Sequence, residues 1–311
     1  MLSLPDVRIL DEEQVTRLLP MDECIAAMEQ VLAALARDEL FNPLRQALRP
    51  PGADNLMGLM TAYGSSYALK AVVVSPGNSE RGLDPHQGTV TLFDGVTGVP
   101  RAVMNASAIT AIRTAAVSAL ASRTLMRKDA RTLAILGTGH QSRPHLDAHR
   151  AVHDWERIVT WSRTYVEEAA TAEEAVRGAD VVVTVTSARE PIVNRAWLQP
   201  GTHVTAAGSS IPTTRELDSQ TMADASLFVD RRESTVNEAG DYLFPMREGL
   251  IGPEHIEAEL GEVLIGSHPG RTSDDELTVF KSLGLAVEDL AAAEHVLRRA
   301  EAENVGSVVS L

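Results

Sequence analysis

The spacing of apolar residues separates helical from strand-like segments in the first part of the chain. Over residues 12–38 apolar side chains recur at i, i+3 and i+4, which predicts helix, and Pro20 marks a second helix start within that range. Residues 45–104 change to short strand-like runs separated by glycine and proline, which predicts an antiparallel sheet. An almost wholly apolar helix is predicted over 106–126. The strand-like runs are 45–49, 56–60, 68–74, 89–93 and 99–104.

From residue 131 the pattern alternates between strand and helix, which is typical of a parallel sheet with crossover connections. We therefore expect an α/β protein in which a parallel-sheet domain, 127–285, is inserted in an α+β domain with an antiparallel sheet. A last amphipathic helix is predicted to carry Leu283, Val287, Leu290, Leu297 and Ala300 on one stripe. The strands expected in the inserted domain are 132–136, 157–161, 179–186, 203–207 and 227–229.

Composition and charge narrow the class of protein. The 311 residues include 28 Lys and Arg against 43 Asp and Glu, a net charge of −15, which argues against a nucleic-acid partner because basic residues bind phosphates. Cys24 is the only cysteine, so a disulfide framework and a thiolate zinc site are excluded and a reducing compartment is expected. The apolar runs are too short to span a membrane, and residues 1–6 lack signal-peptide features. We expect a soluble, cytoplasmic protein with no membrane partner and no metal.

The loop 137–142 reads G-x-G-x-x-S and lies between a predicted buried strand and a helix. Gly137 permits a tight turn, Gly139 lets a pyrophosphate approach the backbone, and Ser142 keeps the third position small. The N-terminus of the following helix offers free N–H groups to the phosphates. This context predicts a dinucleotide site and makes 127–285 a Rossmann-type domain, with a glycine-rich turn that binds nothing as the alternative.

The end of the second strand of this domain predicts the form of the cofactor. A site for NAD expects Asp or Glu there to accept from the ribose hydroxyl, whereas Ser162, Arg163 and Thr164 follow Trp161 here. A guanidinium suits a 2′-phosphate, which predicts NADP(H) as the preferred cofactor. NAD(H) is the alternative if Arg163 is only a surface arginine.

Arg113 is the only formally charged residue between Val103 and Leu120. A guanidinium buried in such a helix needs an anionic partner, because an unpaired buried charge is costly. The pattern leaves two partners open. One is a structural carboxylate of the chain itself, and the other is the carboxylate of a substrate.

Three further residues are candidates for the same chemistry. Lys70 precedes an apolar run and Arg45 opens the first strand-like run. Each alone fits a solvated strand end, whereas together with Arg113 they are compatible with one carboxylate pocket. His86 lies in a predicted loop that leads to a strand, where it fits either proton transfer or a hydrogen-bonded loop histidine.

These residues also carry a resemblance to a known family. The chain resembles the ornithine cyclodeaminase/mu-crystallin family of NAD(P)-dependent enzymes across nearly its full length. The matching stretches are Lys70 with the valines that follow it, 85–90, 109–116, the loop 137–142, 215–218, 238–241 and 278–289.

The resemblance implies a homodimer and assigns functions to the two expected domains. Residues 1–126 with 286–311 are the substrate-binding and dimerisation domain, and 127–285 is the NAD(P)-binding domain. The latter is shortened around 164–180, where the family has a helix, a strand and another helix. This leaves 165–168 as a third strand and 173–177 as one short helix.

The resemblance also assigns site residues. Arg45, Lys70 and Arg113 are implied to grip a substrate carboxylate beside the nicotinamide, and Ser210 belongs to the substrate site. Lys70 or His86 is expected to deliver the proton. The expected cofactor-binding residues are Thr114, Gly137, Thr138, Gly139, His140, Gln141, Ser142, Ser162, Arg163, Thr164, Thr186, Ser187, Ala207 and Gly208.

Two positions indicate a branch of the family. Ser210 stands where cyclodeaminases have the aspartate that activates the substrate amine, and Gly58 stands where they have a glutamate. A serine cannot serve as that base near neutral pH. The Pro-His-Gln and Gly-Ser-Ser stretches instead resemble mu-crystallin, with its ketimine reductase activity, and archaeal-type alanine dehydrogenases.

We therefore expect an NAD(P)H-dependent reductase or dehydrogenase that acts on the C=N or CH–NH bond of a small α-imino or amino acid, such as a cyclic ketimine. Three alternatives stay open at this point. They are an alanine-type or N-carboxyalkyl amino acid dehydrogenase, an ornithine cyclodeaminase-type deamination, and a non-catalytic, crystallin-like protein that binds a small molecule.

Overall fold

The computed structural model describes residues 6–164 and 168–310, and the chain forms two compact units. Unit 1 consists of Met1–Arg113 and Leu285–Leu311, and unit 2 is Thr114–Gly284. The α/β class is confirmed, because unit 2 contains a parallel sheet and unit 1 a sheet of mostly antiparallel strands.

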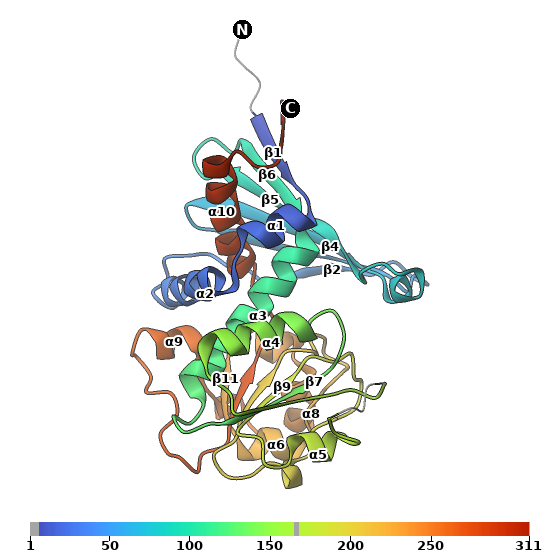
Figure 1. The fold of residues 1–311 in the computed structure, drawn as a ribbon, viewed down its shortest axis with the longest axis vertical. Coiled ribbons are helices and arrows are strands. Elements are labelled where there is room, and N and C mark those ends of the chain that lie inside the picture. Colours follow the sequence, from blue (N-terminus) through green and yellow to red (C-terminus); the bar gives the residue numbers. More distant parts are fainter. Residues whose placement is uncertain (1–5, 165–167, 311) are drawn as a thin grey trace. The chain divides into compact units, whose positions relative to one another are not determined.

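Unit 1 is built on a seven-stranded sheet with the strand order β14-β1-β6-β5-β4-β3-β2 (Figure 1). Its neighbours are antiparallel except β1 and β6, which run parallel, so the sheet is mixed where the sequence predicts only antiparallel strands. Strands β1 and β14, near the two ends of the chain, are not predicted from the sequence pattern. The strands are β1 (Asp6–Leu10), β2 (Gln46–Leu48), β3 (Leu56–Tyr63), β4 (Ser66–Val74), β5 (His86–Asp94), β6 (Pro100–Asn105) and β14 (Ser307–Ser310).

Helices α1, α2 and α10 belong to unit 1, together with a 3₁₀ turn at Pro76–Arg81. The predicted helix break at Pro20 is confirmed, because α1 ends before it and α2 begins after it. Helix α10 packs against α2 and against β3, β4 and β5 (Figure 1). Helix α10 therefore lies over β4, the strand that contains Lys70. The bounds are α1 (Glu12–Leu18), α2 (Met21–Ala36) and α10 (Ala286–Glu303).

Unit 2 contains a seven-stranded sheet, entirely parallel, with the order β12-β11-β13-β10-β9-β7-β8. Alternate residues of its strands enter two hydrophobic cores, since successive side chains point to opposite faces. Ala134 and Leu136 pack into one core, and Leu133 and Ile135 into the other. The strands are β7 (Thr132–Leu136), β8 (Arg157–Trp161), β9 (Val181–Thr184), β10 (His203–Ala206), β11 (Ser226–Val229), β12 (Ile256–Glu259) and β13 (Thr278–Lys281).

The buried helix α3 (Ala106–Leu125) begins in unit 1 and continues into unit 2. The remaining helices of unit 2 are α4 (Ser142–Val152), α5 (Ala172–Val176), α6 (Ser219–Asp224), α7 (Arg232–Glu238), α8 (Gly240–Arg247) and α9 (Leu260–Leu264), with 3₁₀ turns at Arg195–Trp197 and Pro253–His255.

The predicted third strand at 165–168 falls largely on residues 165–167, which lie outside the described residues, and Glu168 forms a bend whose carboxylate accepts from Thr160. The prediction of a loop at His86 is wrong, because this residue is the first of β5, where it pairs with Val74. The short helix at 173–177 is confirmed as α5.

Within the described ranges, the structure contains no helix both long and apolar enough to span a membrane. The same residues hold no group of three or more His, Cys, Asp or Glu side chains that is arranged to hold a metal ion.

Candidate functional site

The last residues of five adjacent strands of unit 2 lie in one row along the carboxyl edge of the sheet. The register pairs them in turn, which gives the row Trp161, Leu136, Thr184, Ala206 and Lys281. Most of the residues predicted to bind cofactor follow this row directly. Parallel sheets bind ligands at this edge, so the row brings the predicted residues to one place.

The order of the strands creates a switch point at β7. The chain continues from β7 to β8 on one side of the sheet and later to β9 on the other, and such points are where open α/β sheets form their crevice. Gly137 stands there with φ +126°, a left-handed conformation, and a Cβ at this position would lie 2.6 Å from the Val185 carbonyl oxygen. Only glycine therefore fits this turn.

The loop 137–142 has the features that a pyrophosphate needs. A Cβ added to Gly139 would meet nothing within 4 Å, so the backbone is open to a ligand there. Gln141 caps α4 without a side-chain hydrogen bond, which leaves helix N–H groups for phosphate oxygens. Thr138 donates to the Ser162 hydroxyl at 2.8 Å and joins this loop to the end of β8. These residues fit a dinucleotide.

Alanine substitutions at two glycines of this edge, Gly139 and Gly208, are expected to have opposite effects on stability. We expect Gly139→Ala to keep the melting temperature, because its Cβ enters open space, and to weaken cofactor binding about tenfold or more by holding the pyrophosphate away. We expect Gly208→Ala to lower stability by about 1–3 kcal/mol, because its Cβ would overlap Thr186 and Glu216. Thermal melts and cofactor titrations of both variants check this. A large loss of stability in Gly139→Ala would contradict the open loop.

Glu216 joins the loops that follow β9 and β10. Its carboxylate is fully buried and accepts from the Thr184 hydroxyl, from the amide and hydroxyl of Thr186, and from the Gly208 amide, at 2.7–2.8 Å. Burial raises the pKa of Glu216, while Lys281 lowers it. The four donated hydrogen bonds favour the ionised carboxylate.

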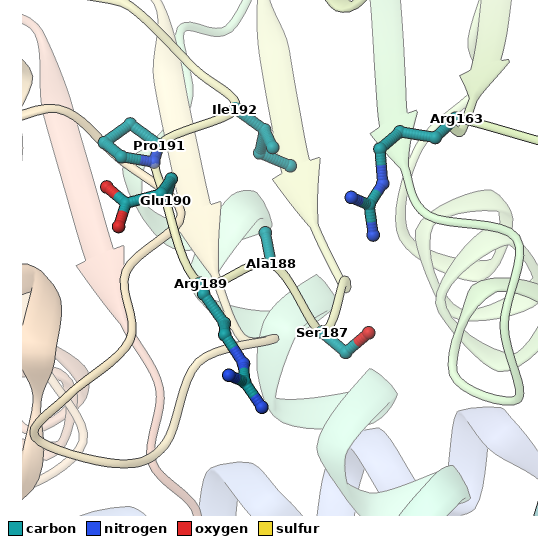
Figure 2. A pocket seen from close by; sticks show the side chains of 7 residues that line it. All are labelled: Arg163, Ser187, Ala188, Arg189, Glu190, Pro191 and Ile192. Atoms are coloured by element: carbon teal, nitrogen blue, oxygen red, sulfur yellow. The ribbon is translucent and has the colours of Figure 1, made fainter.

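Arg163 and the segment 187–192 line a pocket of about 500 Å³ (Figure 2). Arg163 follows β8 and Arg189 follows β9, and the carboxylate of Glu190 points away from the Arg163 guanidinium (Figure 2). No ion pair joins Arg163 or Arg189 to a carboxylate of the described residues. The two guanidinium groups therefore make this pocket suited to an anion.

Unit 1 contains a buried cluster of cations and carboxylates. The Lys70 Nζ lies 3.0 Å from Asp289 Oδ1, and the Arg113 Nε lies 3.1 Å from the same oxygen. Arg113 Nη1 lies 2.8 Å from Glu288 Oε2. All four side chains are at most 5% exposed. The structural carboxylate, one of the two partners that the sequence left open for Arg113, is therefore present, at the start of α10.

Burial lowers the pKa of Lys70 to about 8, an effect that Asp289 opposes and the charges of Arg113 and Arg45 reinforce. Arg45 is half-buried and lies close enough to act on Lys70. The structure thus brings Arg45, Lys70 and Arg113 together. A lysine with a pKa near neutrality can both attract a carboxylate and donate a proton.

Other predicted residues are not brought to these clusters. His86 is exposed and pairs with Val74, four residues along β4 from Lys70, or roughly 13 Å at the usual rise of a strand. Ser210 is half-buried in the loop after β10, and Thr114 is half-buried in α3, the first residue of unit 2. Their predicted roles stay predictions.

Sequence reasoning missed Glu288 and Asp289 as site residues. The available signal was a pair of carboxylates in the first turn of a helix that is otherwise apolar on the same side. It also missed Lys281 and Asp241, which form a fully buried ion pair at 3.0 Å in unit 2. Both belong to stretches that carry the family resemblance, but spacing alone gives no partner for either.

The family model for the ornithine cyclodeaminase/mu-crystallin family matches residues 6–304. The chain belongs to this family. A ketimine reductase mu-crystallin from Mus musculus is 38% identical over 88% of this chain and 90% of its own length. The resemblance stated from the sequence is confirmed.

Two solved structures are similar over almost the whole chain. The Δ¹-pyrroline-2-carboxylate reductase of Thermococcus litoralis, in complex with NADH and L-proline, has a TM-score of 0.92 at 32% identity and covers 96% of this chain and 99% of its own. An archaeal alanine dehydrogenase dimer with bound NAD has a TM-score of 0.92 at 33% identity, with 98% and 99% covered.

Proposed function

We propose that this protein reduces the C=N bond of a small cyclic α-imino acid with a nicotinamide dinucleotide as hydride donor. The chain is an NAD(P)-dependent oxidoreductase that acts on C=N or CH–NH bonds, as its relatives are. The observation that carries the proposal is the row at the carboxyl edge of the unit 2 sheet, which sets the glycine loop, Ser162 and Thr186 at one switch point. Ketimine reductase and pyrroline-2-carboxylate reductase are the relatives' activities that support the substrate class.

The proposed roles of the two units follow their contents. Unit 1, with Arg45, Lys70 and Arg113, binds the substrate carboxylate, and Lys70 gives the proton to the imino nitrogen. Unit 2 would hold the dinucleotide through its glycine loop and strand ends, and the nicotinamide would supply hydride chemistry when bound. Asp289 stabilises the protonated form of Lys70 between turnovers. His86 is a less favoured proton donor, since it is exposed and distant along the strand from Lys70.

The direct test incubates the purified protein with NADH or NADPH and Δ¹-pyrroline-2-carboxylate or Δ¹-piperideine-2-carboxylate, and follows the absorbance of the reduced cofactor. The matched control is Δ¹-pyrroline-5-carboxylate, whose C=N carbon does not bear the carboxylate. We expect oxidation of the cofactor with the 2-carboxylates alone. No turnover with any imino or keto acid would contradict an enzymatic role and favour the non-catalytic alternative.

Amino acid dehydrogenation is the second candidate, favoured by the similarity to the archaeal alanine dehydrogenase. It uses the same cations and the same dinucleotide edge. Cofactor oxidation with pyruvate and ammonia at a higher kcat/KM than with a preformed cyclic imine would make it the principal activity. Ornithine cyclisation has less support, because Ser210 stands where that reaction needs a carboxylate.

We propose NADPH as the preferred form of the cofactor, on the basis of Arg163 and Arg189 in the pocket of Figure 2. Arg163→Ala should weaken NADPH binding by about ten- to a hundredfold and leave NADH binding nearly unchanged, because the guanidinium contacts only the 2′-phosphate. Titration of the intrinsic fluorescence of the reduced cofactor measures both affinities. Arg157→Ala is the matched control, since Arg157 is exposed at the opposite end of β8. Equal losses for the two cofactors would show a structural role for Arg163.

We propose further that the protein is a homodimer, with unit 1 forming the subunit interface. Phe41, Tyr63 and Tyr67 form one exposed aromatic cluster on its sheet, with the rings of Tyr63 and Tyr67 4.5 Å apart. The alanine dehydrogenase neighbour is a dimer. Sedimentation equilibrium measures the mass, and a monomer at micromolar concentration would contradict the proposal.

A further inference from the structure

Three stretches that carry the family resemblance but have no assigned chemistry meet inside unit 2. Glu216, Asp241 and Lys281, one from each stretch, are all fully buried. They are far apart in sequence, in the segment before α6, in the first turn of α8 and at the end of β13. Charged side chains are rarely fully buried unless they are paired, because their desolvation is costly.

These three residues form a connected chain of contacts. Asp241 Oδ1 accepts from the amides of Glu216 and Leu217 at 2.8 and 2.9 Å, and Asp241 Oδ2 lies 3.0 Å from Lys281 Nζ. Lys281 Nζ in turn donates to the carbonyl oxygens of Ala206 and Ser209, at 3.1 and 2.5 Å. The ammonium therefore fixes both ends of the turn that follows β10.

Glu216 fixes the same turn from the other side and ties it to its neighbour. Its Oε2 accepts from the Gly208 amide in the turn after β10, and its Oε1 accepts from the amide and hydroxyl of Thr186 in the turn after β9. Both turns begin directly after the row of strand ends, where the register pairs Thr184 with Ala206. One carboxylate thus sets the spacing between two adjacent turns at the edge of the sheet.

We propose that Glu216, held by Asp241 and Lys281, is a positioning residue for the nicotinamide half of the cofactor. The inference rests on the proposed function. The turns that it fixes contain Thr186 and Gly208, whereas the phosphate loop and Arg163 belong to β7 and β8, farther along the edge. Residues 187–192 of the proposed 2′-phosphate pocket follow Thr186, so the effect on the nicotinamide end is measured by comparing NADH with ADP-ribose, which both lack the 2′-phosphate and share the adenosine half.

Glu216→Gln is the informative variant. It keeps the size of the side chain, but its NH₂ group must face either the Thr186 amide or the Gly208 amide, two donors, so one turn is released. We expect NADH affinity to fall about tenfold, the loss of one charge-assisted hydrogen bond, while ADP-ribose affinity stays within about twofold of the wild type. In turnover we expect kcat to fall and the KM for the imino acid to stay unchanged.

A control variant separates this effect from a general loss of stability. Ser122 is equally buried in unit 2 and bonds His149 and the Thr205 hydroxyl, which lies within β10 and not in either of these turns. Ser122→Ala should lower the melting temperature without changing the ratio of NADH to ADP-ribose affinity. A Glu216→Gln protein that loses both affinities equally, or neither, would overturn the proposal.

A measurement on the wild-type protein covers the case in which the variant does not fold. The amide hydrogens of Thr186 and Gly208 should exchange as slowly as those of β10, because both are bonded to a buried carboxylate. Fast exchange at these two amides would also overturn the inference. If the wild type binds neither NADH nor ADP-ribose, the proposed function itself fails, a result distinct from either outcome above.

Discussion

Lys70→Met is expected to lower kcat for imine reduction by about 10²–10⁴-fold, the usual contribution of a positioned proton donor. The melting temperature should also fall, because the substitution removes one partner of the buried Lys70–Asp289 ion pair and leaves Asp289 with its contact to Arg113 Nε. Initial rates at saturating cofactor, together with thermal melts of both proteins, measure the two effects.

Arg101→Met is the matched control for this variant. Arg101 belongs to β6 of the same sheet, is exposed, and pairs with Glu301. Surface ion pairs contribute about 0–1 kcal/mol, so this variant should keep both rate and stability. If Lys70→Met retains the wild-type rate, the proton comes from another group, and His86 becomes the candidate to replace next.

The pH dependence of the wild type follows from the same residue. Its pKa of about 8 lies below the ordinary value of a lysine, and the group must be protonated to act as an acid. The rate of imine reduction should therefore be level below about pH 8 and fall about tenfold for each further pH unit. A rate that still rises above pH 9 would contradict a role for Lys70 as the acid.

The carboxyl edge of unit 2 was largely predictable from the sequence. Strand ends are local features, and residues that follow adjacent parallel strands must meet at the same edge of the sheet. The strand pattern therefore predicts Gly137 and Ser162 as residues of this edge, whereas Gly208 is predicted only through the family resemblance. The parallel pairing of β1 with β6 was not predictable in the same way, because it joins the start of the chain to a strand about ninety residues later.

The partners of the buried cations could not be predicted from the sequence. Arg113 and Glu288 are 175 residues apart, and the hydrophobic pattern fixes only that each helix has a buried side. Tertiary packing decides which helices bring their buried sides together. The sequence therefore left open whether Arg113 pairs with a structural carboxylate or with the carboxylate of a substrate. The same reason hid the contact of Lys281 with Asp241.

The sequence also did not predict the buried histidines of unit 2, which are expected to have a large effect on stability in acid. His145 and His149 of α4 and His203 of β10 are fully buried. The Nδ1 atoms of His145 and His149 lie 2.7 Å from carbonyl oxygens and so donate, which leaves each Nε2 to accept from a serine hydroxyl. Burial lowers the pKa of His145 to about 3 and that of His149 to about 4, and it also lowers the pKa of His203 well below its ordinary value.

These shifts predict that the protein loses stability in acid. A histidine in the unfolded chain binds a proton near its ordinary pKa of about 6.5, whereas the folded state resists it, so the unfolded state holds more protons below that pH. The stability is fully present above about pH 6.5 and is lost as the pH falls toward the folded values. Between pH 7 and pH 5 each of His145 and His149 should remove about 2 kcal/mol from the free energy of unfolding.

His149→Gln isolates this effect, because glutamine keeps a donor and an acceptor but takes up no proton in this range. Denaturant unfolding at pH 7 and pH 5 should give a drop for this variant that is smaller than the wild-type drop by about 2 kcal/mol, whatever its stability at pH 7. His140→Gln, at an exposed position of the phosphate loop, should leave the drop unchanged. An equal fall in the free energy of unfolding for the wild type and His149→Gln would contradict this prediction. It would mean that the pKa of His149 is the same in the folded and unfolded states.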